Sequence, residues 1–206
     1  MGKAAVFIIE SVKLGEEEKN IREGQIISQI LHLGMIEYKY YYVRTKKELV
    51  RFVKEFGKSD FKYLHLSCHG GPDCIATTLD PISFEELRDI LRPYIANKRL
   101  FVSACYAAND NLAKVVIPST KCFSIIGFSR SIDFDEAAIM WASFYYLMFK
   151  AMSEEGSWKM ERAEILRTLR NISRTFGVPV NYFSKSRGSP KGYRLEKIVP
   201  PTRKGN

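Results

Sequence analysis

Tyr63-Leu64-His65-Leu66-Ser67-Cys68-His69-Gly70-Gly71 is a short apolar run that stops at residues able to do chemistry. A second run of the same kind, Arg99-Leu100-Phe101-Val102-Ser103-Ala104-Cys105, ends in a thiol. Apolar runs of this length, bounded by turn residues, predict buried strands. In an open sheet of parallel strands, active sites assemble at the carboxyl ends of the strands. If these two strands are neighbours, the imidazole of His69 and the thiol of Cys105 face each other across that edge.

Strand-like and helix-like patterns alternate along the chain on both sides of these two runs. Further strands are predicted at about 4–10, 36–43 and 121–128, with a small hairpin at 74–79. Helices are predicted at 16–33, after each of two capping boxes (45–48 and 83–86), after residue 109, and at 135–152 and 159–176. This alternation predicts an α/β fold, a three-layer sandwich with a mostly parallel central sheet and helices on both faces.

The size and composition of the chain predict one cytoplasmic domain. A chain of 206 residues with 46% apolar residues can fill a core without disulfides or metals. Its four cysteines lack the regular spacing of a secreted framework, so we expect free thiols. We find no signal peptide and no apolar stretch of about 18 residues, so we expect no membrane association.

The positive charge is concentrated near the end of the chain. The net charge is +9, and residues 185–204 contain seven lysines and arginines against Glu196 alone. We therefore predict a domain over residues 1–180 and a solvated basic tail over residues 181–206. We do not expect nucleic-acid binding, because no nucleic-acid-binding motif accompanies the tail.

Cys105 and His69 have the setting of a hydrolytic dyad. Cys105 ends its strand just before a predicted helix, and the positive end of a helix favours a thiolate. A histidine can draw the proton from such a thiol. Gly70 follows His69, and its N–H together with that of Cys105 predicts an oxyanion hole. His65 lies in mid-strand, where we expect a core histidine.

Metal and nucleotide chemistry are less favoured by the sequence. Cys68, His69 and Cys74 are close in the chain but form no Cys-x2-Cys or His-x3-His pair, so we expect no zinc site. Residues 11–15, after the first strand, lack both Gly-rich phosphate-binding patterns. We therefore expect no cofactor, and a flavodoxin-like nucleotide binder is kept only as the weakest alternative.

An apolar strand ending in His-Gly, followed by one ending in Ser-Ala-Cys, resembles the caspase-like (clan CD) cysteine peptidases. The closest resemblance is to the bacterial CHAT domains, through Ile125-Ile126-Gly127-Phe128, the acidic turn at 133–138 and the Phe144-Tyr145 pair. It extends over roughly residues 4–150. The resemblance implies a cysteine endopeptidase with a protein or peptide substrate, with His69 as general base, Cys105 as nucleophile and the Gly70 N–H in the oxyanion hole.

The sequence departs from the caspase pattern in two respects. The segment Ser103-Ala104-Cys105-Tyr106-Ala107 is not Gln-Ala-Cys-x-Gly, so cleavage after aspartate is not implied. The dyad residues are 36 positions apart, fewer than the ~50 quoted for caspases. We therefore expect a small domain with short substrate loops. An activating partner protein, self-association or an activating event would complete its cleft.

Three residues after the fifth strand are candidates for the substrate pocket. Relatives of the resembled family that cut after Arg or Lys place an acidic residue at the pocket base, and Asp133 and Asp135 lie where one would be needed. Both also suit the start of a helix, since Glu136 follows Asp133 by three residues. Arg130 is the alternative, and it would favour acidic substrates.

Two functions from different classes remain open at this stage. The first is a regulated endopeptidase, which by analogy with CHAT domains acts in bacterial stress or antiviral defence. The second is a catalytically silent scaffold or regulatory subunit with the same fold, which binds a partner protein. Fold does not decide between them, since unrelated functions share one fold.

Overall fold

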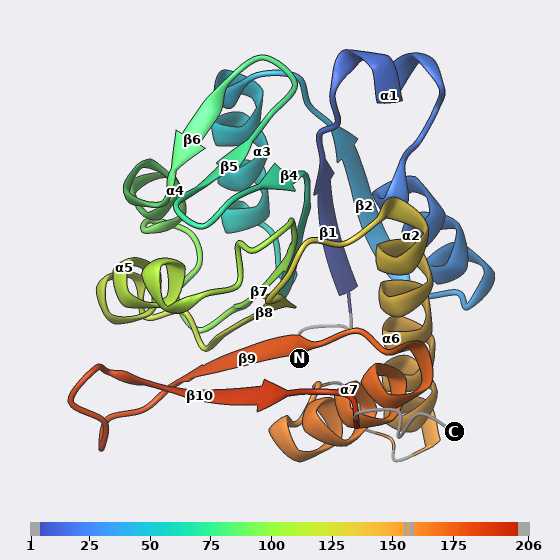
Figure 1. Cartoon of the computed structure of the whole chain (residues 1–206), viewed down its shortest axis with the longest axis vertical. Helices are drawn as coiled ribbons and strands as arrows, with labels where there is room; N and C mark the ends of the chain where they lie inside the picture. Colours follow the sequence, from blue (N-terminus) through green and yellow to red (C-terminus); the bar gives the residue numbers. More distant parts are fainter. Residues whose placement is uncertain (1–4, 155, 157–158, 202–206) are drawn as a thin grey trace.

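The computed structural model describes residues 5–201 except 155, 157 and 158. Its centre is a seven-stranded sheet in the order β10-β9-β8-β7-β3-β1-β2 (Figure 1). The five strands from β8 to β2 run parallel, and β9 and β10 are added antiparallel beside β8. The bounds are β1 Ala5–Glu10, β2 Glu37–Tyr42, β3 Tyr63–Ser67, β7 Arg99–Ser103, β8 Ser124–Phe128, β9 Val180–Lys185 and β10 Tyr193–Ile198.

Helices cover both faces of the sheet, as Figure 1 shows. One face packs against α3 (Lys46–Lys58), α4 (Phe84–Leu91) and α5 (Asp110–Thr120). The other packs against α2 (Glu23–Leu33), α6 (Phe134–Glu154) and α7 (Arg162–Phe176). The predicted three-layer α/β sandwich with a mostly parallel sheet is confirmed.

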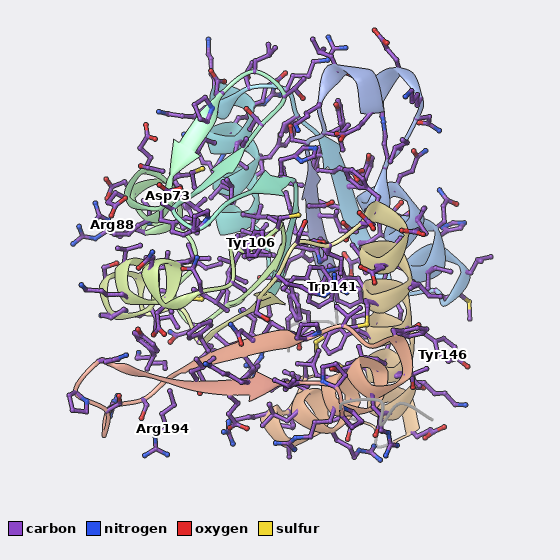
Figure 2. The ribbon with its side chains drawn as sticks, in the orientation of Figure 1. Asp73, Arg88, Tyr106, Trp141, Tyr146 and Arg194 are labelled. Atoms are coloured by element: carbon purple, nitrogen blue, oxygen red, sulfur yellow. The ribbon has the colours of Figure 1, made fainter. Side chains whose placement is uncertain are left out.

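The face under α6 has an aromatic core. Phe101 of β7 is fully buried, and its ring centroid lies 5.5–5.6 Å from those of Trp141, Phe144 and Tyr145. Figure 2 shows Trp141 pointing from α6 toward the sheet and Tyr146 pointing away from it. The helix buries one side in this core, whereas Ile139 and Tyr146 on its other side are about half-exposed.

Both predicted capping boxes are confirmed. At the start of α3, the Thr45 hydroxyl accepts a hydrogen bond from the Glu48 N–H, and the Glu48 carboxylate accepts one from the Thr45 N–H. Ser83 and Glu86 make the same reciprocal pair at the start of α4. Each box satisfies backbone donors that the first turn of a helix would leave unpaired.

The single helix predicted over 16–33 is wrong. The chain forms a short helix α1 (Leu14–Glu18), breaks, and resumes as α2 at Glu23. Asn20 lies in the break with a φ of 54°, a left-handed conformation that no helix interior accepts. Asn tolerates this conformation better than most residues, which is the local reason for the break.

The prediction of a tail beginning at residue 181 is wrong for most of its length. Residues 180–185 and 193–198 form β9 and β10, and the described chain continues to Pro201. Phe183 and Tyr193 are buried against the α5 side, and Tyr182 and Ile198 against the α6 side. Residues 202–206 of the expected tail lie outside the described residues.

A second, small sheet lies beyond the carboxyl ends of the parallel strands (Figure 1). It consists of β4 (His69–Gly70), β5 (Cys74–Ala76) and β6 (Pro81–Ser83), all antiparallel. It extends the hairpin predicted after Gly71, and it fixes the backbone of His69 itself. Among the described helices, none is both long and apolar enough to cross a bilayer.

Candidate active site

The structure brings His69 and Cys105 to one small pocket. Ser67 of β3 pairs with Ser103 of β7. His69 lies two residues after Ser67 and Cys105 two residues after Ser103, so both leave the sheet at the same level. Both side chains line a pocket of about 30 Å³, together with Glu23, Cys68, Ser103, Ala104, Ile132, Asp133, Phe134 and Ala137. The side chains of His69 and Cys105 therefore lie in one pocket at the carboxyl edge of the sheet, as expected.

Close contact between the two loops explains the glycine after His69. A Cβ on Gly70 would lie 2.8 Å from the Ala104 Cβ and 3.1 Å from the Cys105 carbonyl oxygen, which no side chain could accept without movement. Asn109 ties the loops further, because its Nδ2 donates to the carbonyl oxygens of Pro72 (2.8 Å) and Tyr106 (2.9 Å). The His69 and Cys105 loops thus form one packed unit.

Tyr106, the residue after Cys105, has an unusual backbone conformation. Its φ is 58°, in the left-handed region that is uncommon for a tyrosine, and its N–H donates to the Arg130 carbonyl oxygen at 3.1 Å. The side chain is half-exposed and lies beside the ends of β4 and β7 in Figure 2. This sharp turn is what lets the chain leave the sheet at Cys105 and start α5 at Asp110.

His69 is held by a carboxylate that the sequence analysis did not single out. Its Nε2 lies 2.6 Å from Oε2 of Glu16, in α1, and the same oxygen accepts from the Lys13 N–H at 2.8 Å. The ring of Phe134 packs against the imidazole in an edge-to-face arrangement, with 5.7 Å between the ring centroids. Since a carboxylate only accepts, Nε2 carries the proton and Nδ1 is the nitrogen able to take another.

The sulfur of Cys105 is engaged by the segment that follows β8. Sγ lies 3.4 Å from the Ile132 nitrogen, 3.5 Å from the Ile132 carbonyl oxygen and 3.6 Å from the Ser131 hydroxyl. Among the hydrogen bonds of the described residues, none joins this sulfur to His69. The segment 131–134 therefore covers the thiol, and the pocket below it has room for about one water molecule.

The other three thiols are poor nucleophiles in this fold. Burial raises the pKa of Cys68 and of Cys122 to about 12. Partial burial and the neighbouring Asp73 raise the pKa of Cys74. Since the thiolate is the reactive form, none of the three competes with a reactive cysteine at neutral pH.

The three predicted substrate-pocket residues lie in different places. Asp133 lines the pocket beside Cys105. Asp135 accepts from the Glu136 N–H at 2.9 Å, which serves the first turn of α6. Arg130 pairs with the Glu136 carboxylate at 3.0 Å and donates to the Ser131 carbonyl oxygen. Only Asp133 of the three is in the pocket wall.

A cluster of buried polar side chains lies behind the pocket. Glu10, the last residue of β1, accepts from the Gly24 N–H and the Tyr40 hydroxyl, both at 2.7 Å. Burial outweighs these bonds and raises the pKa of Glu10 to about 7. His65 is fully buried, as predicted for a core histidine, and its Nδ1 shares a hydrogen bond with the Tyr145 hydroxyl at 2.9 Å.

Glu10 should make the stability of the fold depend on pH. Its pKa is about 7 in the fold against 4.5 in an unfolded chain, so the fold favours the protonated carboxyl. That contribution is complete below pH 4.5 and is lost as the pH rises to about 7. We expect the free energy of unfolding of the wild type to fall between pH 4.5 and 8 by roughly 3 kcal/mol more than that of Glu10→Gln.

Urea denaturation at both pH values measures this difference. Glu55→Gln, which removes an exposed carboxylate on α3, is the matched control and should follow the wild type. Parallel losses of stability in wild type and Glu10→Gln would show that Glu10 does not titrate in this range.

Comparison with known proteins supports the fold. No protein-family model and no curated protein sequence matches the chain. Among solved structures, the inactive zymogen of a C11 protease from Parabacteroides distasonis matches with a TM-score of 0.52 and 11% identity, over 87% of this chain and 61% of that one. The structure of pro-sf-caspase-1 matches with a TM-score of 0.50 and 12% identity, over 84% of this chain and 81% of that one.

At such low identity the likeness shows the fold alone. This chain has the mixed α/β architecture of caspase-like proteases, with a mostly parallel central sheet, so the predicted caspase-like fold is confirmed. The chain spans about three fifths of the length of the C11 protease that it matches. The narrower resemblance to CHAT domains stays a prediction.

Proposed function

We propose that this chain is a cysteine endopeptidase that uses a His69–Cys105 dyad. The observation that carries the proposal is the convergence of both side chains on one pocket at the carboxyl edge of a caspase-like sheet. The imidazole takes the thiol proton, and the sulfur attacks the peptide carbonyl carbon. The C–N bond breaks as the imidazolium returns its proton to the leaving amine. Water then hydrolyses the thioester and regenerates the thiol.

Glu16 has a positioning role in this proposal. Its carboxylate accepts a hydrogen bond from the Nε2–H of His69, with 2.6 Å between Nε2 and Oε2. This bond fixes the tautomer whose Nδ1 can receive the thiol proton. It also stabilises the imidazolium that forms when the proton moves. The N–H groups of Gly70 and Cys105 are proposed to stabilise the oxyanion.

We propose further that the structure is the resting form of the enzyme. Ile132 holds the sulfur, and the pocket is too small for a substrate side chain. The two structures compared above are described as an inactive zymogen and a pro-caspase. An activating partner, self-association or another signal would move residues 131–134. A bacterial stress or antiviral-defence role rests on the analogy to CHAT domains alone.

The second candidate, a catalytically silent scaffold, is favoured by the same engaged sulfur. Alkylation by iodoacetamide, followed by mass spectrometry of the four cysteine peptides, separates the two. For a dyad we expect Cys105 to react first and Cys74 at least about tenfold more slowly, because the Cys74 pKa is raised. Cys122, which is buried, should react only on unfolding, and Cys68 should react slowly because its pKa is raised to about 12.

His69→Ala and Glu16→Gln are the informative variants in that assay. Both should slow the alkylation of Cys105, His69→Ala by about 10²-fold or more, while leaving Cys74 unchanged. Equal, slow alkylation of Cys105 and Cys74 in the wild type, unaffected by either variant, would favour the scaffold.

A further inference from the structure

Glu23 is a buried carboxylate directly below the candidate dyad. It is the first residue of α2, and it is 3% exposed. Its Oε2 accepts from the Ser103 hydroxyl at 2.8 Å and from the Ser67 hydroxyl at 3.1 Å. These two serines are the residues that precede Cys105 and His69 by two positions, so the carboxylate is bonded to both strands that present the dyad.

The second oxygen of Glu23 lacks a hydrogen-bond partner. Oε1 is buried, and no hydrogen bond reaches it from the described residues. The nearest titratable nitrogen is Nε2 of His65 at 3.5 Å, which also has no hydrogen bond. Leaving a buried carboxylate oxygen unpaired is costly, so its presence calls for an explanation.

The walls around Glu23 match a long side chain with a cationic end. Ala104, Ile132, Phe134 and Ala137 supply apolar surface. The acidic groups of the pocket are Glu23 and Asp133, and no Lys or Arg is among the described residues that line it. Once residues 131–134 have moved, apolar walls beside a carboxylate would suit the methylene stem and the charged end of Lys or Arg.

We propose that Glu23 is the floor of the primary specificity pocket, and that it selects substrates with a cationic side chain before the scissile bond. This rests on the proposed endopeptidase function. The cationic end pairs with Oε1, which accepts no hydrogen bond and lies 3.5 Å from Nε2 of His65, while Ser67 and Ser103 hold Oε2 in place. Movement of residues 131–134 both opens this pocket and frees the sulfur, so access to the specificity pocket and exposure of the nucleophile are one event.

Peptidyl acyloxymethyl ketones that differ only in the last residue test this on the full chain. The first pair of probes carries arginine or citrulline, which has nearly the shape of arginine but is neutral. A second pair carries lysine or norleucine, which lacks the amine, and shows whether the pocket prefers lysine or arginine. We expect Cys105 of the wild type to be labelled by the arginine probe at least about 30-fold faster than by the citrulline probe, the effect of one charge-assisted bond.

Glu23→Gln keeps the volume and an acceptor for the serines, and it should reduce the ratio of arginine to citrulline labelling to near one. Glu10→Gln, which changes a buried carboxyl that does not line the pocket, is the matched control and should keep the wild-type ratio. A melting curve for each variant verifies that it is folded.

The outcomes separate this inference from the function beneath it. Equal labelling by arginine and citrulline in the wild type, with Cys105 still the thiol that reacts first with iodoacetamide, overturns the pocket and leaves the dyad standing. A preference for arginine that survives in Glu23→Gln overturns the assignment to Glu23. If Cys105 reacts with neither probe nor iodoacetamide, both proposals fall.

Discussion

Replacing Cys105 with alanine is expected to abolish peptide hydrolysis. In the proposed mechanism the sulfur of Cys105 forms the covalent intermediate. The other thiol that lines the pocket, Cys68, cannot replace it, because burial raises the pKa of Cys68 to about 12. Removal of a catalytic nucleophile from a hydrolase costs about 10⁴-fold or more in rate. Digestion of a mixed peptide library, with products identified by mass spectrometry, should show wild-type cleavage sites that are absent from the Cys105→Ala digest.

Cys74→Ala is the control for this experiment. Cys74, the first residue of β5, is partly exposed and does not line the pocket, so its removal should leave the cleavage pattern intact. The same products from Cys105→Ala as from the wild type would show that the sulfur is not the nucleophile. A library left whole by the wild type, together with a Cys105 that iodoacetamide alkylates no faster than Cys74, would favour the silent scaffold.

Phe101→Ala is expected to produce the largest loss of stability among single substitutions in the α6 face of the core. Phe101 is fully buried in the central strand β7, between the rings of Trp141, Phe144 and Tyr145. Truncation leaves a cavity that a sheet held on both sides cannot close. Substitutions of this kind cost about 3–5 kcal/mol. For a domain of this size the melting temperature should fall by roughly 10 °C.

Phe123→Ala removes the same side chain from a half-exposed position just before β8, and it should change the free energy of unfolding by less than about 1 kcal/mol. Urea denaturation of both variants at one pH gives the comparison. Similar losses in the two variants would mean that the aromatic cluster around Trp141 relaxes into the space left by Phe101.

Most of the strands and helices, and from their alternation the three layers, could be predicted because their signals are local. Apolar strands, capping boxes and the helix start at Asn109 are each encoded within a few residues. β9 and β10 were missed because seven lysines and arginines gather in residues 185–204, and this charge suggested a solvated tail. In the fold, Phe183 and Tyr193 pack inward while the charged neighbours extend to solvent.

The candidate site could be predicted in part. The positions of His69 and Cys105 followed from two strand ends, and the structure places both in one pocket. Glu16 and Glu23 were not found, because acidic residues in a first helical turn are ordinary and their partners are 53 and 80 positions away. The lone Glu10 closing an otherwise apolar strand was the one local sign of a buried carboxylate.

The hydrogen bonds between Ile132 and the Cys105 sulfur also offer a way to search for the activator of this protein. The main chain of Ile132 is hydrogen-bonded to the sulfur, so movement of this residue should raise the rate at which iodoacetamide alkylates Cys105. A molecule that activates the enzyme should raise the rate of Cys105 alkylation, even when the natural substrate of the enzyme is unknown. Screening extracts for faster alkylation could therefore identify the activator before the first cleaved protein is known.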